Sequence, residues 1–170
     1  MSKVYIVSRS VYEYEDIFED KDMAFSSREK AVAKAKELFD KDKEAQIKDL
    51  EDSLKYKKQE LERKEKEHEE KGYDKHLDSD DFKERYKRFI DANDTSTGII
   101  FADKSTQDIL TKEDWGAIKS KQSISHVEKR IATLEQALDR VKHKEFDGKC
   151  YEFFHEGLSK SCNIKELELM

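Results

Sequence analysis

The sequence predicts an α+β fold, in which the two chain ends form a small ββα(β)β head and a long antiparallel helical arm is inserted between them. Three observations predict this fold. The 170 residues contain no proline and only five glycines, which favours long uninterrupted helices. Two stretches repeat apolar residues with heptad spacing, as paired helices do. β-Branched and aromatic residues gather near both ends of the chain, as they do in strands.

The composition argues against a nucleic-acid-binding protein and a membrane protein. The apolar fraction is 35% and the charged fraction 44%, against roughly 45–50% and 25% in ordinary globular chains. The net charge of -6 is a small difference between 34 basic and 40 acidic residues, so we expect no direct contact with nucleic acid. No apolar run approaches the length of a membrane span or a signal peptide. We therefore expect a cytoplasmic protein without membrane contact.

The N-terminal segment predicts a strand, a return segment and a helix. Residues 3–12 alternate as a strand does, and an acidic turn or short strand follows over residues 13–22. Ser26 and Glu29 have the spacing of a capping box, so we expect the helix to begin there. Its predicted buried stripe consists of Ala31, Ala35, Leu38 and Phe39.

Heptad spacing predicts the two helices of the arm. The first seam contains Ile47, Leu50, Leu54 and Leu61 and fades toward residue 70. The second contains Ile124, Val127, Ile131, Leu134, Leu138 and Val141. The two seams can pair within one chain as a coiled-coil hairpin, or the second seam can pair with its copy in a homodimer, and heptads alone do not decide between these.

The middle segment is more aromatic and predicts a small tip. Ser79 can cap a short helix that carries Phe82, Tyr86, Phe89 and Ile90. Residues 94–98 predict a loop and residues 99–101 a short strand. Thr111 with Asp114 can open the next helix, which runs into the second seam.

The C-terminal segment predicts the end of this helix and the return to the head. Asp147-Gly148 breaks the helix after Phe146, residues 150–154 form an apolar strand or helix end, and residues 164–169 form a closing strand. The predicted domains are a head of residues 1–40 and 147–170, an arm of residues 41–71 and 119–146, and a tip of residues 72–118.

The residues of the first strand, Tyr12-Glu13-Tyr14 and the Phe25-Ser26-Ser27 turn together resemble a pattern in small accessory proteins of tailed bacteriophages. The resemblance covers about the first 40 residues and about the last ten. It implies a phage or mobile-element origin and a non-enzymatic protein that binds a host protein, such as a defence-system component or nuclease, in the host cytoplasm. It carries no functional residue over to this chain.

Catalytic and metal-binding patterns are weak. His143, Cys150, His155 and Cys162 are donors that zinc accepts, but they lack the closely spaced pairs of a structural site, so we expect neither metal nor cofactor. The sequence contains no GxSxG motif and no glycine-rich phosphate loop. We expect no enzymatic activity, although carboxylate pairs leave a metal-dependent nuclease open.

The acidic stretch is the most polarised surface that the sequence offers. Acids interleaved with aromatics suit docking on a basic surface, because carboxylates steer the approach and aromatic rings supply contact energy. We predict that the partner-binding residues are Tyr12, Glu13, Tyr14, Glu15, Asp16, Phe18, Glu19 and Asp20, with Tyr86 and Trp115 at the tip. The predicted function is inhibition of a host protein by occlusion, and the alternative is a structural or DNA-associated coiled-coil dimer.

Overall fold

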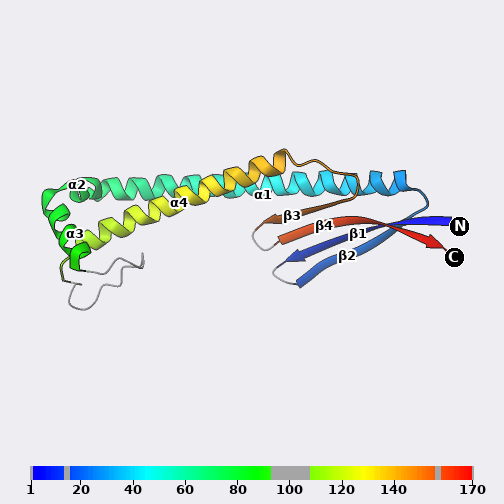
Figure 1. Cartoon of the computed structure of the whole chain (residues 1–170). Helices are drawn as coiled ribbons and strands as arrows, with labels where there is room; N and C mark the ends of the chain where they lie inside the picture. Colours follow the sequence, from blue (N-terminus) through cyan, green and yellow to red (C-terminus); the bar gives the residue numbers. More distant parts are fainter. Residues whose placement is uncertain (1, 14–15, 93–107, 156–157, 170) are drawn as a thin grey trace. The chain divides into compact units, whose positions relative to one another are not determined.

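The computed structural model describes residues 2–13, 16–92, 108–155 and 158–169, except for the side chains of residues 2, 13, 16–20, 155 and 169. The predicted α+β class is confirmed (Figure 1). In chain order the described elements are β1 (Ser2–Glu13), β2 (Asp16–Phe25), α1 (Arg28–Glu70), α2 (Tyr73–Asp78), α3 (Asp80–Ala92), α4 (Lys112–Lys142), β3 (Cys150–His155) and β4 (Leu158–Leu169).

The chain divides into two compact units. Unit 1 comprises Met1–Ser53 and Leu134–Met170, and unit 2 comprises Leu54–Thr133. The helices α1 and α4 each contribute one part to unit 1 and another to unit 2. No described helix is both long and apolar enough to cross a membrane.

Unit 1 contains an antiparallel sheet with the strand order β2-β1-β4-β3. The first and last strands pair along their whole length, from Ser2 opposite Leu169 to Glu13 opposite Leu158. Of the acidic segment that the sequence left as a turn or a short strand, residues 16–22 lie in the outer strand β2, which continues through the apolar Met23–Phe25. A β-bulge between Val11 and Tyr12 shifts its register against β1.

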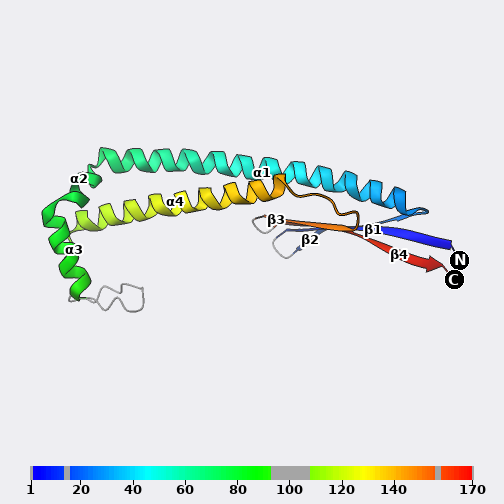
Figure 2. The same cartoon turned by 45° about the horizontal axis from the view of Figure 1, so that its top comes forward.

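One face of this sheet is covered by the first part of α1 (Figure 2). Ala31 and Ala35 of α1 are fully buried. Phe39 is also buried and lies 5.5 Å from the ring of Tyr151 and 5.4 Å from that of Phe153. Each such aromatic pair contributes about 0.5–1.5 kcal/mol beyond its area burial. Leu38, the fourth member of the predicted stripe, is half-buried.

The predicted capping residue of α1 was wrong by one position. The backbone N–H of Lys30 donates to Ser27 Oγ at 3.4 Å, and the N–H of Ala31 donates to the Ser27 carbonyl. Ser27 is therefore the N-cap, and Glu29 falls in the first turn, where a carboxylate interacts favourably with the helix dipole. Ser26 lies outside the helix because the strand β2 extends to Phe25.

The helix α4 ends at Lys142, before the predicted break at Phe146. Lys43 of α1 donates to the carbonyl oxygens of Lys142 and Lys144, both at 2.8 Å, which satisfies acceptors that a helix end leaves unpaired. Phe146 then stacks on Phe39 at 5.7 Å. The positive φ of Gly148, 79°, turns the chain into β3.

Unit 2 has a short helix that the sequence analysis missed. Gly72 ends α1 in the left-handed conformation (φ 66°) and starts α2. The prediction that Ser79 caps the next helix is confirmed, since the N–H of Phe82 donates to Ser79 Oγ at 3.3 Å. Thr111 and Asp114 open α4 as predicted. The loop and strand predicted for residues 94–101 lie outside the described residues.

Every heptad position of the two predicted seams is buried or half-buried. On α1, Leu50 and Leu54 are buried, while Ile47 and Leu61 are half-buried. On α4, Val127, Ile131, Leu134 and Val141 are buried, while Ile124 and Leu138 are half-buried. In unit 2, Lys64 and His68 of α1 bond Ser123 and Ser120 of α4, at 2.7 and 2.9 Å. A homodimer through the second seam stays a prediction, and it would have to expose residues that one chain already buries.

Candidate functional site

The predicted acidic docking surface begins on β1 and continues on the outer strand β2. Tyr12 is an exposed large aromatic residue, and its backbone lies opposite Ile17. Ser10 lies opposite Asp20 and Val11 opposite Glu19. The backbone of these acids therefore forms one edge of the sheet.

Most side chains of this surface lie outside the described residues. These are the side chains of Glu13, Tyr14, Glu15, Asp16, Phe18, Glu19 and Asp20, and for Tyr14 and Glu15 the backbone lies outside as well. The prediction that these side chains bind a partner rests on the sequence and on the position of the β2 backbone.

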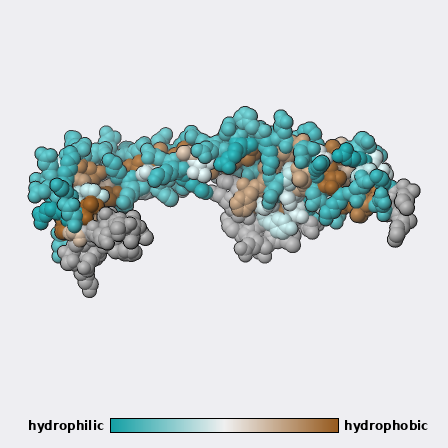
Figure 3. All heavy atoms as spheres, in the orientation of Figure 1, coloured by the Kyte–Doolittle hydropathy of each residue, from teal (hydrophilic) through white to brown (hydrophobic). Residues whose placement is uncertain are grey.

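The two predicted tip residues belong to an aromatic cluster in unit 2. Tyr86 stacks on Phe82 at 5.5 Å and on Phe89 at 6.5 Å, and Trp115 meets Phe89 edge-on at 5.4 Å. Phe82 and Phe89 are buried and Trp115 is half-buried. Tyr86 is 37% exposed. The cluster is a local core, from which Tyr86 presents one edge to solvent; hydrophobic residues are visible at this end of unit 2 (Figure 3).

The four candidate zinc ligands are not brought together in the part of the chain that the structure describes, where no group of three or more metal-binding side chains occurs. Cys162 is buried and lies opposite Tyr151. Cys150 precedes Tyr151 on the same strand, so its exposed side chain points to the other face of the sheet. Burial raises the pKa of the Cys162 thiol to about 11. The side chain of His155 lies outside the described residues.

A buried polar group that sequence reasoning missed connects α1 to the sheet in unit 1. Asp42 is buried, accepts a hydrogen bond from Tyr151 Oη at 2.8 Å, and pairs with Arg9 Nη2 at 2.8 Å. Burial, and after it the adjacent carboxylate of Asp42, raises the pKa of Tyr151, which keeps its phenol a hydrogen-bond donor. The three residues lie 33 and 109 positions apart in the chain, so no local motif could have revealed the group.

A second buried carboxylate connects α2 and α3 to α4 in unit 2. Asp114 is fully buried, and its Oδ1 accepts from His76 Nε2 at 2.7 Å and from Arg85 Nη2 at 2.9 Å. Its Oδ2 accepts from Arg85 Nε at 2.9 Å and from the N–H of Thr111 at 2.8 Å. The Thr111 contact was predicted as a helix cap, whereas the contacts of His76 and Arg85 were not foreseen.

The charge of Asp114 is stable in the folded protein. Burial alone would raise its pKa, but the hydrogen bonds from Arg85, Thr111 and His76 outweigh burial and hold the pKa well below its usual range. A carboxylate with so low a pKa is a weak base near neutral pH. Asp114 therefore stabilises the packing of α2 and α3 on α4, and it has neither the free lone pairs nor the solvent access that a catalytic base or metal ligand needs.

No protein-family model, curated protein or solved structure matches this chain.

Proposed function

We propose that this chain is a non-enzymatic protein that binds a partner protein through the acidic strand β2 and inhibits it by covering a basic surface. The observation that carries the proposal is the position of the acids. Five acids, Glu13, Glu15, Asp16, Glu19 and Asp20, stand close together in the sequence. Three of them, Asp16, Glu19 and Asp20, belong to the outer strand β2. A surface with one sign of charge at an exposed edge can meet a partner without rearrangement of the fold.

Charged and aromatic side chains contribute in different ways to such docking. Carboxylates along one edge raise the association rate with a positively charged surface, and salt weakens this effect. Tyr12, exposed beside them, supplies the kind of aromatic contact that dominates binding energy in interfaces. Elsewhere the many charges are interspersed in sign, so the acidic edge is the part of the molecule that a basic partner distinguishes.

The proposal includes a finer architecture. We propose that the sheet and the start of α1 act as a ββα(β)β head and that α1 and α4 pair as a coiled-coil arm. Hydrogen bonds between the two helices support this, such as Lys142 to Glu51 at 2.9 Å in unit 1 and Lys64 to Ser123 at 2.7 Å in unit 2. The resemblance of the N-terminal segment to phage accessory proteins supports a host protein as the partner, met in the host cytoplasm.

Charge reversal at the acidic edge tests the proposal. In the test variant Glu13, Glu15, Asp16, Glu19 and Asp20 are changed to lysine. The control variant carries the same change in charge on exposed helical positions: Glu62, Glu65, Glu69, Glu84 and Glu128. Intact protein and both variants are used to capture partners from bacterial lysate at low and high salt.

We expect the intact protein and the control variant to recover the same partner, and the test variant to lose it. The recovered partner should dissociate as salt rises, because contacts between exposed charges are screened. If the test variant recovers that partner as well as the control does, β2 is not the docking surface. Circular dichroism of each variant establishes that a loss of binding is not a loss of fold.

A further inference from the structure

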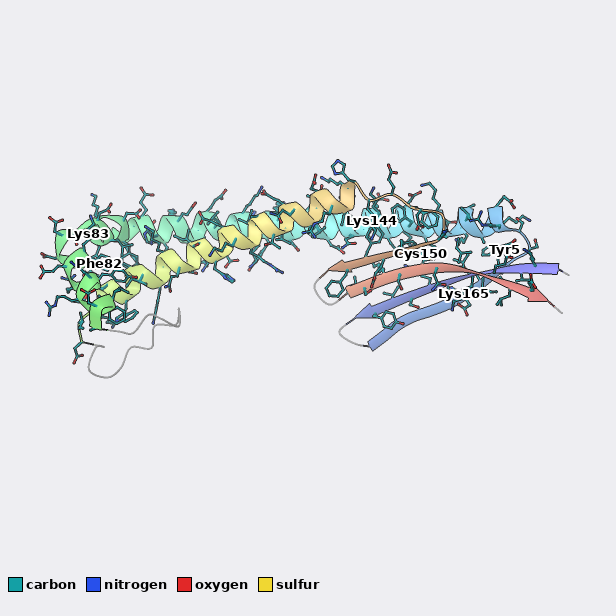
Figure 4. The ribbon with its side chains drawn as sticks, viewed as in Figure 1. Tyr5, Phe82, Lys83, Lys144, Cys150 and Lys165 are labelled. Atoms are coloured by element: carbon teal, nitrogen blue, oxygen red, sulfur yellow. The ribbon has the colours of Figure 1, made fainter. Side chains whose placement is uncertain are left out.

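Two polar side chains of α1 in unit 2 occupy positions that heptad spacing assigns to apolar residues. Lys64 and His68 follow Leu61 at the next core positions of its heptad frame. His68 is only 4% exposed, and the side chain of Lys64 is 22% exposed. In paired helices a polar residue at such a position lowers stability but can fix the register of pairing. The side chains of α1 and α4 are drawn in Figure 4, where Phe82 marks the position of α3.

Both side chains bond to serines of α4. Lys64 Nζ donates to Ser123 Oγ at 2.7 Å, and His68 Nδ1 lies 2.9 Å from Ser120 Oγ. Ser120 and Ser123 are themselves half-buried. A step of four residues along α1 thus corresponds to a step of three residues back along α4, as two antiparallel helices require. At this register each of the two polar side chains of α1 has a partner on α4.

Gly116 adds a third contact at the same register, between α2 and α4. Glycine in the interior of a helix is unfavourable, so its presence within α4 needs a reason. A Cβ atom at this position would lie 2.8 Å from the hydroxyl oxygen of Tyr73, so the glycine makes room for that side chain. Residues 64, 68 and 73 rise along one side while residues 123, 120 and 116 fall along the other. The three contacts therefore describe one antiparallel alignment.

The apolar residues of the seam do not select this alignment by themselves. Ile124 and Ile131 of α4 stand seven positions apart, so a slip of α4 by one heptad replaces one aliphatic side chain by another. The same slip is unfavourable for Lys64. In one direction it brings Arg130 opposite Lys64, and in the other direction Gly116. Neither side chain offers the ammonium group an acceptor.

We propose, on the basis of the pairing of α1 with α4 proposed above, that three register contacts fix how the two helices align. These contacts are Lys64–Ser123, His68–Ser120 and Tyr73–Gly116. They act by a difference between alignments, because a slip takes the partners away and a buried polar group without a partner is unfavourable. Leucine at positions 64 and 68 would bury more apolar area but would remove this discrimination.

Distances between two spin labels, measured by pulsed electron paramagnetic resonance on the full-length protein, report the alignment. The labels are attached at Lys55→Cys and Lys119→Cys, two exposed positions of unit 2. The parent chain carries Cys150→Ser, which removes an exposed native thiol. In the alignment of the structure the labels are offset by about 20 Å along the helices, and a slip by one heptad changes the offset by about 10 Å.

Two leucine variants with the same labels are compared. The test variant combines Lys64→Leu with His68→Leu. The control variant is Lys57→Leu, which also places leucine at a core position of the same frame, but Lys57 donates to Glu60 of its own helix at 2.7 Å. We expect one narrow distance distribution for the parent chain and the control. The test variant should add a second population whose distance differs by about 10 Å.

Two further variants guard against a test variant that does not fold, which circular dichroism would reveal. Ser120→Leu with Ser123→Leu removes the same two bonds from the α4 side and should also give the second distance. Lys64→Ser with Ser123→Lys exchanges one pair across the helices and should keep the single distance. A single distance in both double-leucine variants, or the second distance in Lys57→Leu, would overturn the proposal. A parent chain whose labels are not at the paired distance would refute the pairing of α1 with α4 and the proposal with it, whereas docking through the acidic edge would be untouched.

Discussion

Replacing Asp114 by asparagine tests whether one buried carboxylate holds α2 and α3 against the start of α4. Both oxygens of Asp114 accept two hydrogen bonds each, from His76, from Arg85 twice and from the Thr111 backbone. Asparagine has nearly the same shape, but one oxygen becomes an NH₂ group. Whichever way the amide is turned, that NH₂ faces two donors. The substitution therefore removes two hydrogen bonds without creating a cavity.

The expected loss of stability follows from these contacts. Hydrogen bonds to a charged group contribute about 1.5–3 kcal/mol each, and breaking a buried ion pair costs about 3–5 kcal/mol. The side chain of Arg85 is 28% exposed and can turn partly to water, which lowers this cost. We expect the free energy of unfolding of unit 2 to fall by about 3 kcal/mol.

The effect should shrink at low pH. The pKa of Asp114 is depressed in the folded protein, so its stabilisation is complete above its unfolded pKa of about 3.9 and is lost as pH falls toward the folded value. At pH 3 the unfolded state is mostly protonated while the folded state is still charged. The difference between wild type and variant should then be about 1 kcal/mol smaller than at pH 5.

Urea unfolding followed by tryptophan fluorescence measures both effects, because Trp115 is the single tryptophan of the chain and packs on Phe89 in unit 2. The control is Glu128→Gln, an exposed residue of α4 in unit 2 that should change stability by less than about 0.5 kcal/mol. A loss below about 1 kcal/mol for Asp114→Asn, or a loss that is equal at pH 5 and pH 3, would refute the reasoning.

Three further predictions concern unit 1. Ser27→Ala should cost about 1 kcal/mol as the loss of a helix cap, whereas Ser26→Ala should cost less than about 0.5 kcal/mol; urea unfolding followed by circular dichroism compares them. A thiol reagent at pH 8 should modify Cys150 and leave Cys162 unmodified until the protein is denatured, because the Cys162 thiol is buried and its pKa is raised to about 11; mass spectrometry counts the modified thiols. Phe39→Ala should cost about 3–5 kcal/mol, and a smaller loss in thermal unfolding would show that the ring is not central to the core.

Periodicity predicted the elements well and the polar contacts poorly. Leu50, Leu54, Val127 and Leu134 are buried because heptad spacing reports which helix face is apolar, whatever that face packs against. The cap at Thr111 was also predictable, since it depends on residues three positions apart. Patterns of this kind can be predicted because the residues that form them are close together in the sequence.

The contacts that the sequence did not predict join residues that are distant in the chain. Asp42 looks like one more charge on an exposed helix until Arg9 and Tyr151 meet it. The end of α4 at Lys142 was placed four residues too late, and the contact found there, from Lys43 of another element to the carbonyl oxygen of Lys142, leaves no local signal.

The pairing of β1 with β4 has a consequence for how the protein assembles during synthesis. The strand β1 can pair with β2 and receive α1 early, but its other edge stays bare until the ribosome has added β4, whose Leu169 lies opposite Ser2. Contacts between such remote segments form slowly, and a bare strand edge invites association with other chains. The nascent chain should therefore be most prone to aggregate just before β4 emerges, and a chaperone that covers strand edges should raise its yield.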